Sequence, residues 1–193
     1  MKKAWPWAFL LLAIALLCAR LFVFEPFRAP AGSMVPALDQ GDHFLINKLS
    51  RSPARGDIIV FQYPRDPEKE FVKRVIAVGG DTVEIKDDQV WLNGAALPHT
   101  KKGLVKRDEL DEDGLTVHHE YQAVEEQLGG KTYTVYYQPK SPRQSFRALK
   151  IPAGSYYVLG DNRDNSHDSR WWGSVSKDAI RGTVSTVWYR PKK

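Results

Sequence analysis

The sequence predicts a mainly β protein, in which an antiparallel β-sheet domain with an inserted subdomain follows one N-terminal transmembrane helix. Short runs rich in β-branched and aromatic residues recur along the chain. Gly, Pro, Asn and Asp separate them, which is typical of antiparallel strands. A long uncharged apolar run precedes these strands. At 193 residues the chain is long enough for one hydrophobic core and an appended subdomain.

The N-terminal run is the segment expected to cross a membrane. Two lysines open the chain, residues 4–19 carry no charge, and Arg20 interrupts apolar residues that continue to position 24. The stretch 4–24 has 21 residues, close to the ~20 that span a bilayer core as a helix. A cleaved export signal, which would need a clean A-x-A site, and a buried core helix are the alternatives. We expect residues 1–25 to be a cytoplasmic tip and a retained anchor, because a short basic head stays inside.

The strand-like runs define the expected domains. They are residues 43–49, 57–63, 71–78, 82–85, 90–94, 132–137, 155–160 and 182–190. Residues 26–97 and 149–193 form the predicted β core, and the more polar stretch 98–148 is interpreted as an insertion or subdomain. The pair Asn93-Gly94 between apolar runs predicts a type I′ hairpin, because both central residues of that turn need positive φ.

The composition argues against several classes of function. The formal net charge is +5, but the 28 basic and 23 acidic residues are mixed, so we expect no nucleic-acid partner and a weak preference for an anionic membrane surface. Cys18 is the one cysteine, which rules out a disulfide framework or a cysteine metal cluster in a monomer. The five histidines form no H-E-x-x-H motif and are expected to be exposed. We therefore expect no metal and no organic cofactor.

Ser33 is the first candidate for chemistry. It follows Gly32 and lies between Pro30 and Pro36, so a small hydroxyl is presented by a backbone that proline stiffens and glycine bends. The alternative is an ordinary turn serine. A catalytic serine needs a neighbouring group that takes its proton, and the histidines show no recognisable His-Asp-Ser context.

Lys73 is the second candidate, because it lies inside an apolar strand-like run. Strand alternation places Lys73 on one face with Phe71 and Val75, whereas Arg74 points to the other face. If the Lys73 face is buried, loss of hydration lowers the pKa of the ammonium by up to ~3–5 units and makes the amine a base. A snorkelling lysine on an edge strand is the alternative.

Four blocks in order carry a resemblance to a known family. They are AGSMVPALDQGD (31–42), RGDIIVFQYP (55–64), FVKRVIAVGGDTVEI (71–85) and GDNRDNSHDSRWWG (160–173). Together they resemble the bacterial type I signal peptidases, a family of proteases with a Ser/Lys dyad. The resemblance covers most of the chain except the insertion. It implies a membrane-bound serine endopeptidase that removes signal peptides, with Ser33 as nucleophile and Lys73 as general base.

The same resemblance implies supporting roles in the last block. Ser166 matches a serine that hydrogen-bonds the lysine and orients it, and Asp168 and Arg170 match an ion pair that fixes the loop. Ala31 departs from the pattern, because many Gram-negative members carry there a serine whose hydroxyl helps to bind the oxyanion. Loss of one such donor is worth ~3–4 kcal/mol in catalysis.

The implied substrate is an exported preprotein with an A-x-A-like site. Shallow apolar pockets for its first and third residues before the cut are implied at Phe27, Ala29, Pro30, Met34, Leu38, Phe44, Phe71 and Val72, with ordinary core packing as the alternative. Trp171, Trp172 and Trp188 are assigned either to the membrane interface or to the core. The resemblance implies a monomer in the bacterial cytoplasmic membrane. It would be single-pass, with a cytoplasmic N-terminus and the catalytic domain on the outer, periplasmic face, in contact with the lipid bilayer.

Other functions remain as alternatives. Residues 174–177 spell the S-x-x-K of penicillin-binding enzymes, but the companion S-D-N and K-T-G elements are missing. Self-cleaving repressors also use Ser and Lys, but they need a DNA-binding front end. A dedicated peptidase for pilus or conjugation proteins, and a catalytically silent membrane-tethered scaffold, are compatible with the same fold.

Overall fold

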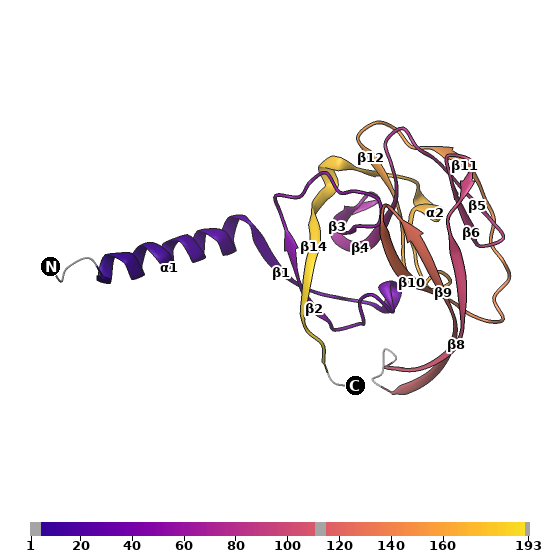
Figure 1. Cartoon of the computed structure of the whole chain (residues 1–193), viewed down its shortest axis with the longest axis horizontal. Coiled ribbons are helices and arrows are strands. Elements are labelled where there is room, and N and C mark those ends of the chain that lie inside the picture. The colour runs from indigo at the N-terminus through magenta and orange to yellow at the C-terminus, as the bar shows by residue number, and fades with distance from the viewer. Residues whose placement is uncertain (1–4, 111–114, 192–193) are drawn as a thin grey trace.

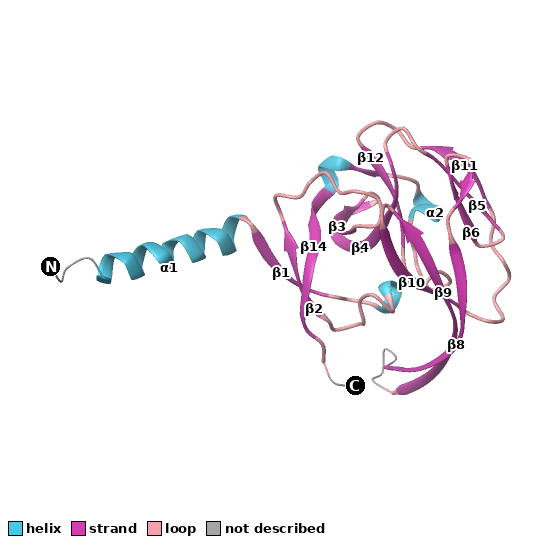
Figure 2. Ribbon diagram, in the orientation of Figure 1, coloured by secondary structure: helices cyan, strands magenta, loops and turns pink. Residues whose placement is uncertain are grey.

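A computed structural model describes residues 5–110 and 115–191, and Figure 1 shows a long helix that projects from a β domain. The helix, α1 (Trp5–Phe22), leads directly into the first strand, β1 (Phe24–Arg28). Figure 2 shows that strands make up most of the domain, which confirms the prediction of a mainly β protein. Strands pair antiparallel throughout the three sheets that the described residues form.

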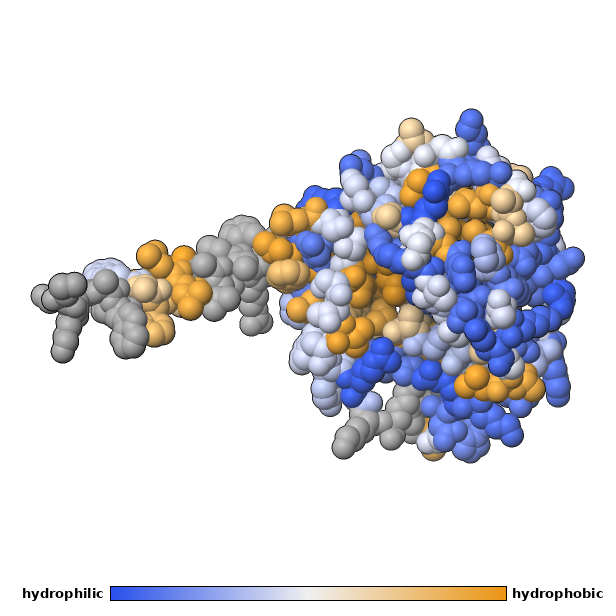
Figure 3. All heavy atoms as spheres, in the orientation of Figure 1, coloured by the Kyte–Doolittle hydropathy of each residue, from blue (hydrophilic) through white to orange (hydrophobic). Residues whose placement is uncertain are grey.

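The helix α1 is shorter than the predicted span over residues 4–24. It ends at Phe22 after 18 residues, because Phe24 already pairs with Asn47 of strand β2 (His43–Asn47). Within the described residues no helix is both long and apolar enough to cross a membrane. Residues 1–4, which include the residues before the predicted span, lie outside them. The described apolar side chains of α1 are exposed, as Figure 3 shows.

The largest sheet has seven strands in the order β1-β2-β14-β3-β4-β12-β13. Its remaining members are β3 (Ile58–Tyr63), β4 (Asp66–Val78), β12 (Ser155–Leu159), β13 (Val175–Ser176) and β14 (Ile180–Tyr189). The C-terminal strand β14 lies between β2 and β3, so the last strand of the chain pairs with strands from its N-terminal part. This sheet carries β4, the strand on which Lys73 lies.

Two smaller sheets complete the domain. One has the order β11-β5-β6-β7 and comprises β5 (Thr82–Lys86), β6 (Gln89–Leu92), β7 (Ala95–Ala96) and β11 (Phe146–Lys150). The other has the order β10-β9-β8 and comprises β8 (His99–Leu110), β9 (Thr116–Leu128) and β10 (Lys131–Tyr137). Short helices are α2 (Ser169–Trp172) and the 3-10 turns η1 (Gly32–Met34) and η2 (Lys177–Ala179).

All eight predicted strand runs coincide with strands of the structure. The expected hairpin is also present, since Leu92 pairs with Ala95 and the two residues between them have φ values of 54° at Asn93 and 82° at Gly94. The sequence analysis missed the long strands β8 and β9. Both lie in the polar segment 98–148, which was expected only to be an insertion or subdomain.

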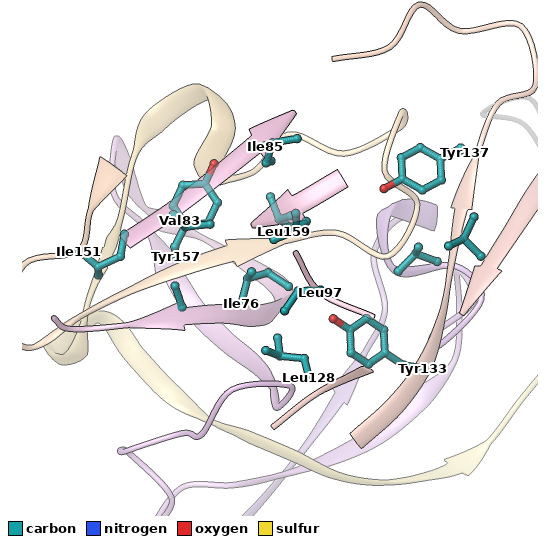
Figure 4. Packing of buried hydrophobic residues seen from close by; sticks show 14 residues of the cluster. Ile76, Val83, Ile85, Leu97, Leu128, Tyr133, Tyr137, Ile151, Tyr157 and Leu159 are labelled. Carbon is teal, nitrogen blue, oxygen red and sulfur yellow. The ribbon is translucent and has the colours of Figure 1, made fainter. Parts of the chain in front are cut away.

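One buried apolar cluster ties the segment 98–148 to the rest of the domain. Figure 4 shows its side chains converging from all three sheets: Ile76, Val83, Ile85, Leu97, Leu128, Tyr133, Tyr137, Ile151, Tyr157 and Leu159. A second cluster packs Val35, just after the η1 turn, against Tyr121, Ala123 and Tyr136 of the β10-β9-β8 sheet. Strands far apart in sequence therefore meet in shared apolar clusters, and the smaller of these two clusters includes the residue that follows the η1 turn.

Candidate active site

Ser33 lies in the η1 turn, and the loop after β12 holds the backbone of this turn. The N–H of Asn162 donates to the carbonyl oxygen of Ser33 at 3.1 Å, and Nδ2 of Asn162 donates to the carbonyl oxygen of Gly32 at 3.3 Å. The chain enters the turn through Ala31 in extended conformation. The half-buried Ser33 is thus held in place by Asn162, which lies 130 positions after Gly32 in the sequence.

Lys73 lies on β4 with its side chain directed at Ser33. Its Nζ donates to Ser33 Oγ at 2.6 Å and to the carbonyl oxygen of Val72 at 3.1 Å, and it lies 5.4 Å from the ring centroid of Phe71. Only 4% of Lys73 is exposed. The fold therefore brings the η1 turn against β4, so that two side chains 40 positions apart in the sequence meet.

Burial decides the acid–base behaviour of Lys73. Loss of hydration is the largest effect and lowers the pKa of Lys73 from 10.5 to about 8. The carboxylates of Asp168 and Asp161 raise this pKa, and the guanidinium of Arg170 lowers it. Desolvation outweighs the attraction of the two carboxylates, so a substantial fraction of the amine is neutral near pH ~8.

Two buried ion pairs hold the loop that carries Asn162. Arg74 donates to both carboxylate oxygens of Asp161, at 2.8 and 2.6 Å, and to the carbonyl oxygen of Gly56. Arg163 makes the same two-point contact with Glu126 of β9, at 2.8 and 2.6 Å. Each of these four side chains is at most 7% exposed, so the pairs are charge-assisted hydrogen bonds shielded from water.

A third pair lies at the end of the same loop. Arg170 contacts both oxygens of Asp168, at 2.7 and 2.8 Å, and donates to the carbonyl oxygen of Arg163. Asp168 also accepts from the N–H of Gly160 at 3.0 Å. The hydrogen bond from Ser166 to the lysine that the resemblance implies is not formed. The Ser166 Oγ is buried and has no partner among the described residues, and the two acceptors of Lys73 Nζ are Ser33 Oγ and the carbonyl oxygen of Val72.

A cleft of about 480 Å³ opens in front of the two side chains. Its lining residues are Ala29, Pro30, Ala31, Ser33, Lys69, Glu70, Phe71, Val72, Lys73, Asn165 and His167. Four of the eight predicted pocket residues are therefore in the cleft wall. The other four, Phe27, Met34, Leu38 and Phe44, are not among the lining residues and belong to an apolar cluster that also contains Ala29 and Val72. For these four, the alternative of core packing describes their position better.

The chain matches a known protein family over most of its length. The family described as signal peptidase, peptidase S26, matches residues 2–189. The chain belongs to this family. Because this is a family of peptidases, the chain is assigned as a peptidase.

Individual signal peptidases I are similar over most of their length. The one from Pseudomonas fluorescens is 34% identical over 97% of this chain and 70% of its own length. The one from Aquifex aeolicus is 35% identical over 94% of this chain and 82% of its own length. The match to a crystal structure of a signal peptidase I from Enterococcus faecalis covers 70% of this chain and 99% of the chain in that structure, at 30% identity and a TM-score of 0.42.

The sequence analysis missed four of the residues that line the cleft of this member of the signal peptidase family. Lys69, Glu70, Asn165 and His167 line it, yet only their proximity to Lys73 and Ser166 in the sequence hinted at this. His167 was expected to be merely an exposed polar side chain. It is exposed, but its Nε2 lies 3.1 Å from the hydroxyl oxygen of Tyr63.

The three tryptophans assigned to the membrane interface or the core lie in different surroundings. Trp171 is 54% exposed and Trp188 is 57% exposed, whereas Trp172 packs against an apolar cluster that contains Phe61. Contact with lipid stays a prediction for the two exposed rings.

Proposed function

We propose that this protein is a membrane-bound serine endopeptidase that removes signal peptides from exported preproteins, with Ser33 as nucleophile and Lys73 as general base. The observation that carries the proposal is the 2.6 Å contact between Lys73 Nζ and Ser33 Oγ, combined with the burial of the lysine. Geometry and a lowered pKa are the two properties that a general base needs. Membership of the family supports the same reaction.

In the proposed reaction neutral Lys73 accepts the proton of Ser33 while Oγ attacks the scissile carbonyl carbon. The ammonium then gives that proton to the nitrogen of the leaving chain, the C–N bond breaks, and the signal peptide is left as an ester on Oγ. Neutral Lys73 next takes a proton from a water that attacks the ester carbon. The signal peptide leaves as a carboxylic acid, and Ser33 regains its proton from the lysine.

The negative oxygen of the tetrahedral intermediate needs a hydrogen-bond donor. The backbone N–H of Ser33 is the proposed donor, and the two contacts from Asn162 support it by fixing the turn that aims this N–H. Ala31 offers no hydroxyl at the cleft. We therefore assign the oxyanion to the backbone rather than to a side chain at position 31.

The cleft supports a substrate with small side chains near the cut. Its apolar lining comes from Ala29 and Pro30 on one segment and from Phe71 and Val72 on β4, close to Ser33. An extended substrate places every second side chain on the same side, so the first and third residues before the cut would enter this apolar part. Alanine at both positions offers small apolar side chains to this apolar lining.

We propose that α1 holds the protein at the bacterial cytoplasmic membrane, with the N-terminus in the cytoplasm, the catalytic domain on the outer face and one protein molecule per active unit. Support comes from the described apolar side chains of α1, which are 47–67% exposed: Trp7, Phe9, Leu10, Leu11, Leu12, Ile14 and Leu17. Transfer of these side chains from water into lipid would be favourable. Fractionation of cells followed by alkaline carbonate extraction tests this. Retention in the membrane pellet is expected, and release into the supernatant contradicts the proposal.

The reaction is tested with full-length protein in detergent and a preprotein that carries an A-x-A site. Ser33→Ala and Lys73→Ala should each abolish cleavage. Ser174→Ala and Lys177→Ala are matched controls, because they remove the serine and lysine of the S-x-x-K sequence and Lys177 is exposed. These two controls should cleave like the wild type.

The possible outcomes separate the competing functions. Loss of activity only in the Ser33 and Lys73 variants supports the dyad, whereas loss only in the Ser174 or Lys177 variants supports a penicillin-binding type of enzyme instead. Wild-type protein that cleaves no preprotein contradicts the proposal and favours a silent scaffold. A panel of general secretory and pilus-type preproteins then separates a general from a dedicated peptidase.

A further inference from the structure

The lining of the cleft divides into an apolar part and a polar rim. The polar rim, defined here as Lys69, Glu70, Asn165 and His167, comes from the start of β4 and from the loop after β12. Lys69 pairs with Asp66 at 2.8 Å, and Glu70 lies 3.4 Å from Arg181. Two of the four side chains therefore already have charged partners.

The other two members of the polar rim have hydrogen-bonding capacity to spare. The side chain of Asn165 forms no hydrogen bond with the described residues, and His167 forms only the one to Tyr63. When the Tyr63 hydroxyl donates to Nε2, the proton of the neutral imidazole is on Nδ1, and a protonated imidazole donates from both nitrogens. In both forms Nδ1 of His167 is a donor, as is Nδ2 of Asn165. In the other neutral tautomer Nε2 donates to the Tyr63 hydroxyl oxygen and Nδ1 accepts, so the subsite uses the two forms in which Nδ1 donates.

His167 is held in place, unlike an ordinary exposed histidine. Its ring lies edge-on to Tyr63 at 5.8 Å and to Phe71 at 6.5 Å between centroids, and Tyr63 stacks on Phe71 at 4.5 Å. Phe71 is itself a neighbour of Lys73 on β4. An imidazole fixed in this way loses less side-chain freedom when a ligand binds, which favours its use in recognition.

We propose that His167 and Asn165 form a subsite for the second residue before the cut, and that it binds a carboxylate or carboxamide side chain. The inference rests on the proposed function. If the first and third side chains of an extended substrate enter the apolar part, the second points away from it, and the polar rim is the remaining lining. Two donors select acceptors: Glu and Gln offer acceptor oxygens, Leu has none, and Lys only donates.

The test uses four preproteins that differ only in the middle residue of A-x-A, which is Glu, Gln, Leu or Lys. Initial rates at low substrate concentration give kcat/KM for wild type, His167→Ala and Tyr63→Phe in detergent. His118→Ala is the matched control, because His118 is an exposed histidine on strand β9 whose Nδ1 contacts Asp108. The readout is the Glu:Leu ratio within each variant, which a general loss of folding or activity does not change.

The wild type should prefer Glu over Leu by about 10-fold, which equals about 1.4 kcal/mol, with Gln between them and Lys no better than Leu. The preference should fall to within about two-fold in His167→Ala, fall in part in Tyr63→Phe because the ring loses its anchor, and stay intact in His118→Ala.

A wild-type Glu:Leu ratio below about two-fold, or a ratio that survives His167→Ala, overturns the subsite while leaving the peptidase intact. Failure of the wild type to cleave any of the four preproteins, or cleavage by Ser33→Ala, overturns the proposed function, and the subsite with it. The two failures are therefore distinguishable.

Discussion

Raising the pH from about 6 to about 9 should accelerate cleavage in proportion to the fraction of Lys73 that carries a neutral amine. With the pKa of Lys73 lowered to about 8 by burial, ~1% of the amine is neutral at pH ~6 and ~90% at pH ~9. The expected gain in kcat/KM is therefore about 90-fold, with a slope of one logarithmic unit per pH unit below the pKa and a plateau above it.

The assay follows kcat/KM for a preprotein with leucine as the middle residue of A-x-A, so that the polar rim contributes little. Measurements in overlapping buffers of constant ionic strength exclude effects of salt on the exposed charges. Because kcat/KM reports the free enzyme, the apparent pKa of the profile is that of Lys73 before substrate binds.

Two results would refute this reasoning. A profile that still climbs through pH ~10 would mean that Lys73 has the pKa of a solvated lysine, near ~10.4. A flat profile between pH ~6 and ~9 would mean that proton transfer to a group with a pKa of about 8 does not limit the reaction at all. Either result removes the link between burial and catalysis.

The remaining predictions concern stability and the position of the nucleophile. Because burial lowers the pKa of Lys73 in the folded state, the unfolded chain binds more protons than the folded chain between pH ~8 and ~10.4. The free energy of unfolding of the wild type, compared with that of Lys73→Met, should therefore rise on the order of 3 kcal/mol across this window. Urea unfolding at each pH measures it. Gly160→Ala places a methyl group 2.5 Å from the carbonyl oxygen of Ser33, so kcat should fall at least ~10-fold, and an unchanged kcat would contradict the close packing. Glu126→Leu leaves Arg163 charged and buried, so chemical denaturation should show a loss of about 3–5 kcal/mol, larger than the loss in Glu126→Gln; a loss below ~1 kcal/mol would contradict the buried pair.

The strands that the sequence predicted are those in which side-chain pattern and burial agree. Residues 155–160 and 71–78 are rich in β-branched and aromatic residues because β12 and β4 pack against apolar clusters on both sides of the sheet. The strands β8 and β9 lack this signal. They pair over a long hairpin in which most of β8 is exposed and the buried residues of β9 begin only at Tyr121, so neither strand shows a continuous run of β-branched and aromatic residues.

The site was predictable only in part from the residues. Strand alternation correctly placed Lys73 and Arg74 in different surroundings, one at Ser33 and one at Asp161. Alternation says nothing about which distant segment meets each face, so the contact with Ser33 was suggested by the resemblance alone. The partner of Arg163, Glu126, lies in segment 98–148, outside the four blocks that carry the resemblance, and no local pattern marks a pair that joins a loop to a distant strand.

The end of the apolar helix illustrates a limit of counting hydrophobic residues. The apolar run continues through residues 21–24, and a count of apolar positions cannot separate a helix from a strand there. Long-range backbone contacts decide the question, because the carbonyl oxygen of Val23 accepts from the N–H of Lys48 at 2.8 Å and Phe24 pairs with Asn47 of β2. Tertiary pairing thus overrides the local pattern at this boundary.

The central claim, that an amine at position 73 activates Ser33, is tested most directly by removing and restoring that amine. In a Cys18→Ser background, Lys73→Cys leaves one thiol, at the cleft lining, and 2-bromoethylamine converts it into an aminoethyl thioether of nearly lysine length with loss of bromide. Iodoacetamide gives a control adduct without a basic nitrogen. We predict no cleavage by Lys73→Cys, recovery after 2-bromoethylamine and none after iodoacetamide. Cleavage before alkylation, or equal activity after both reagents, would contradict the role of Lys73 as the base.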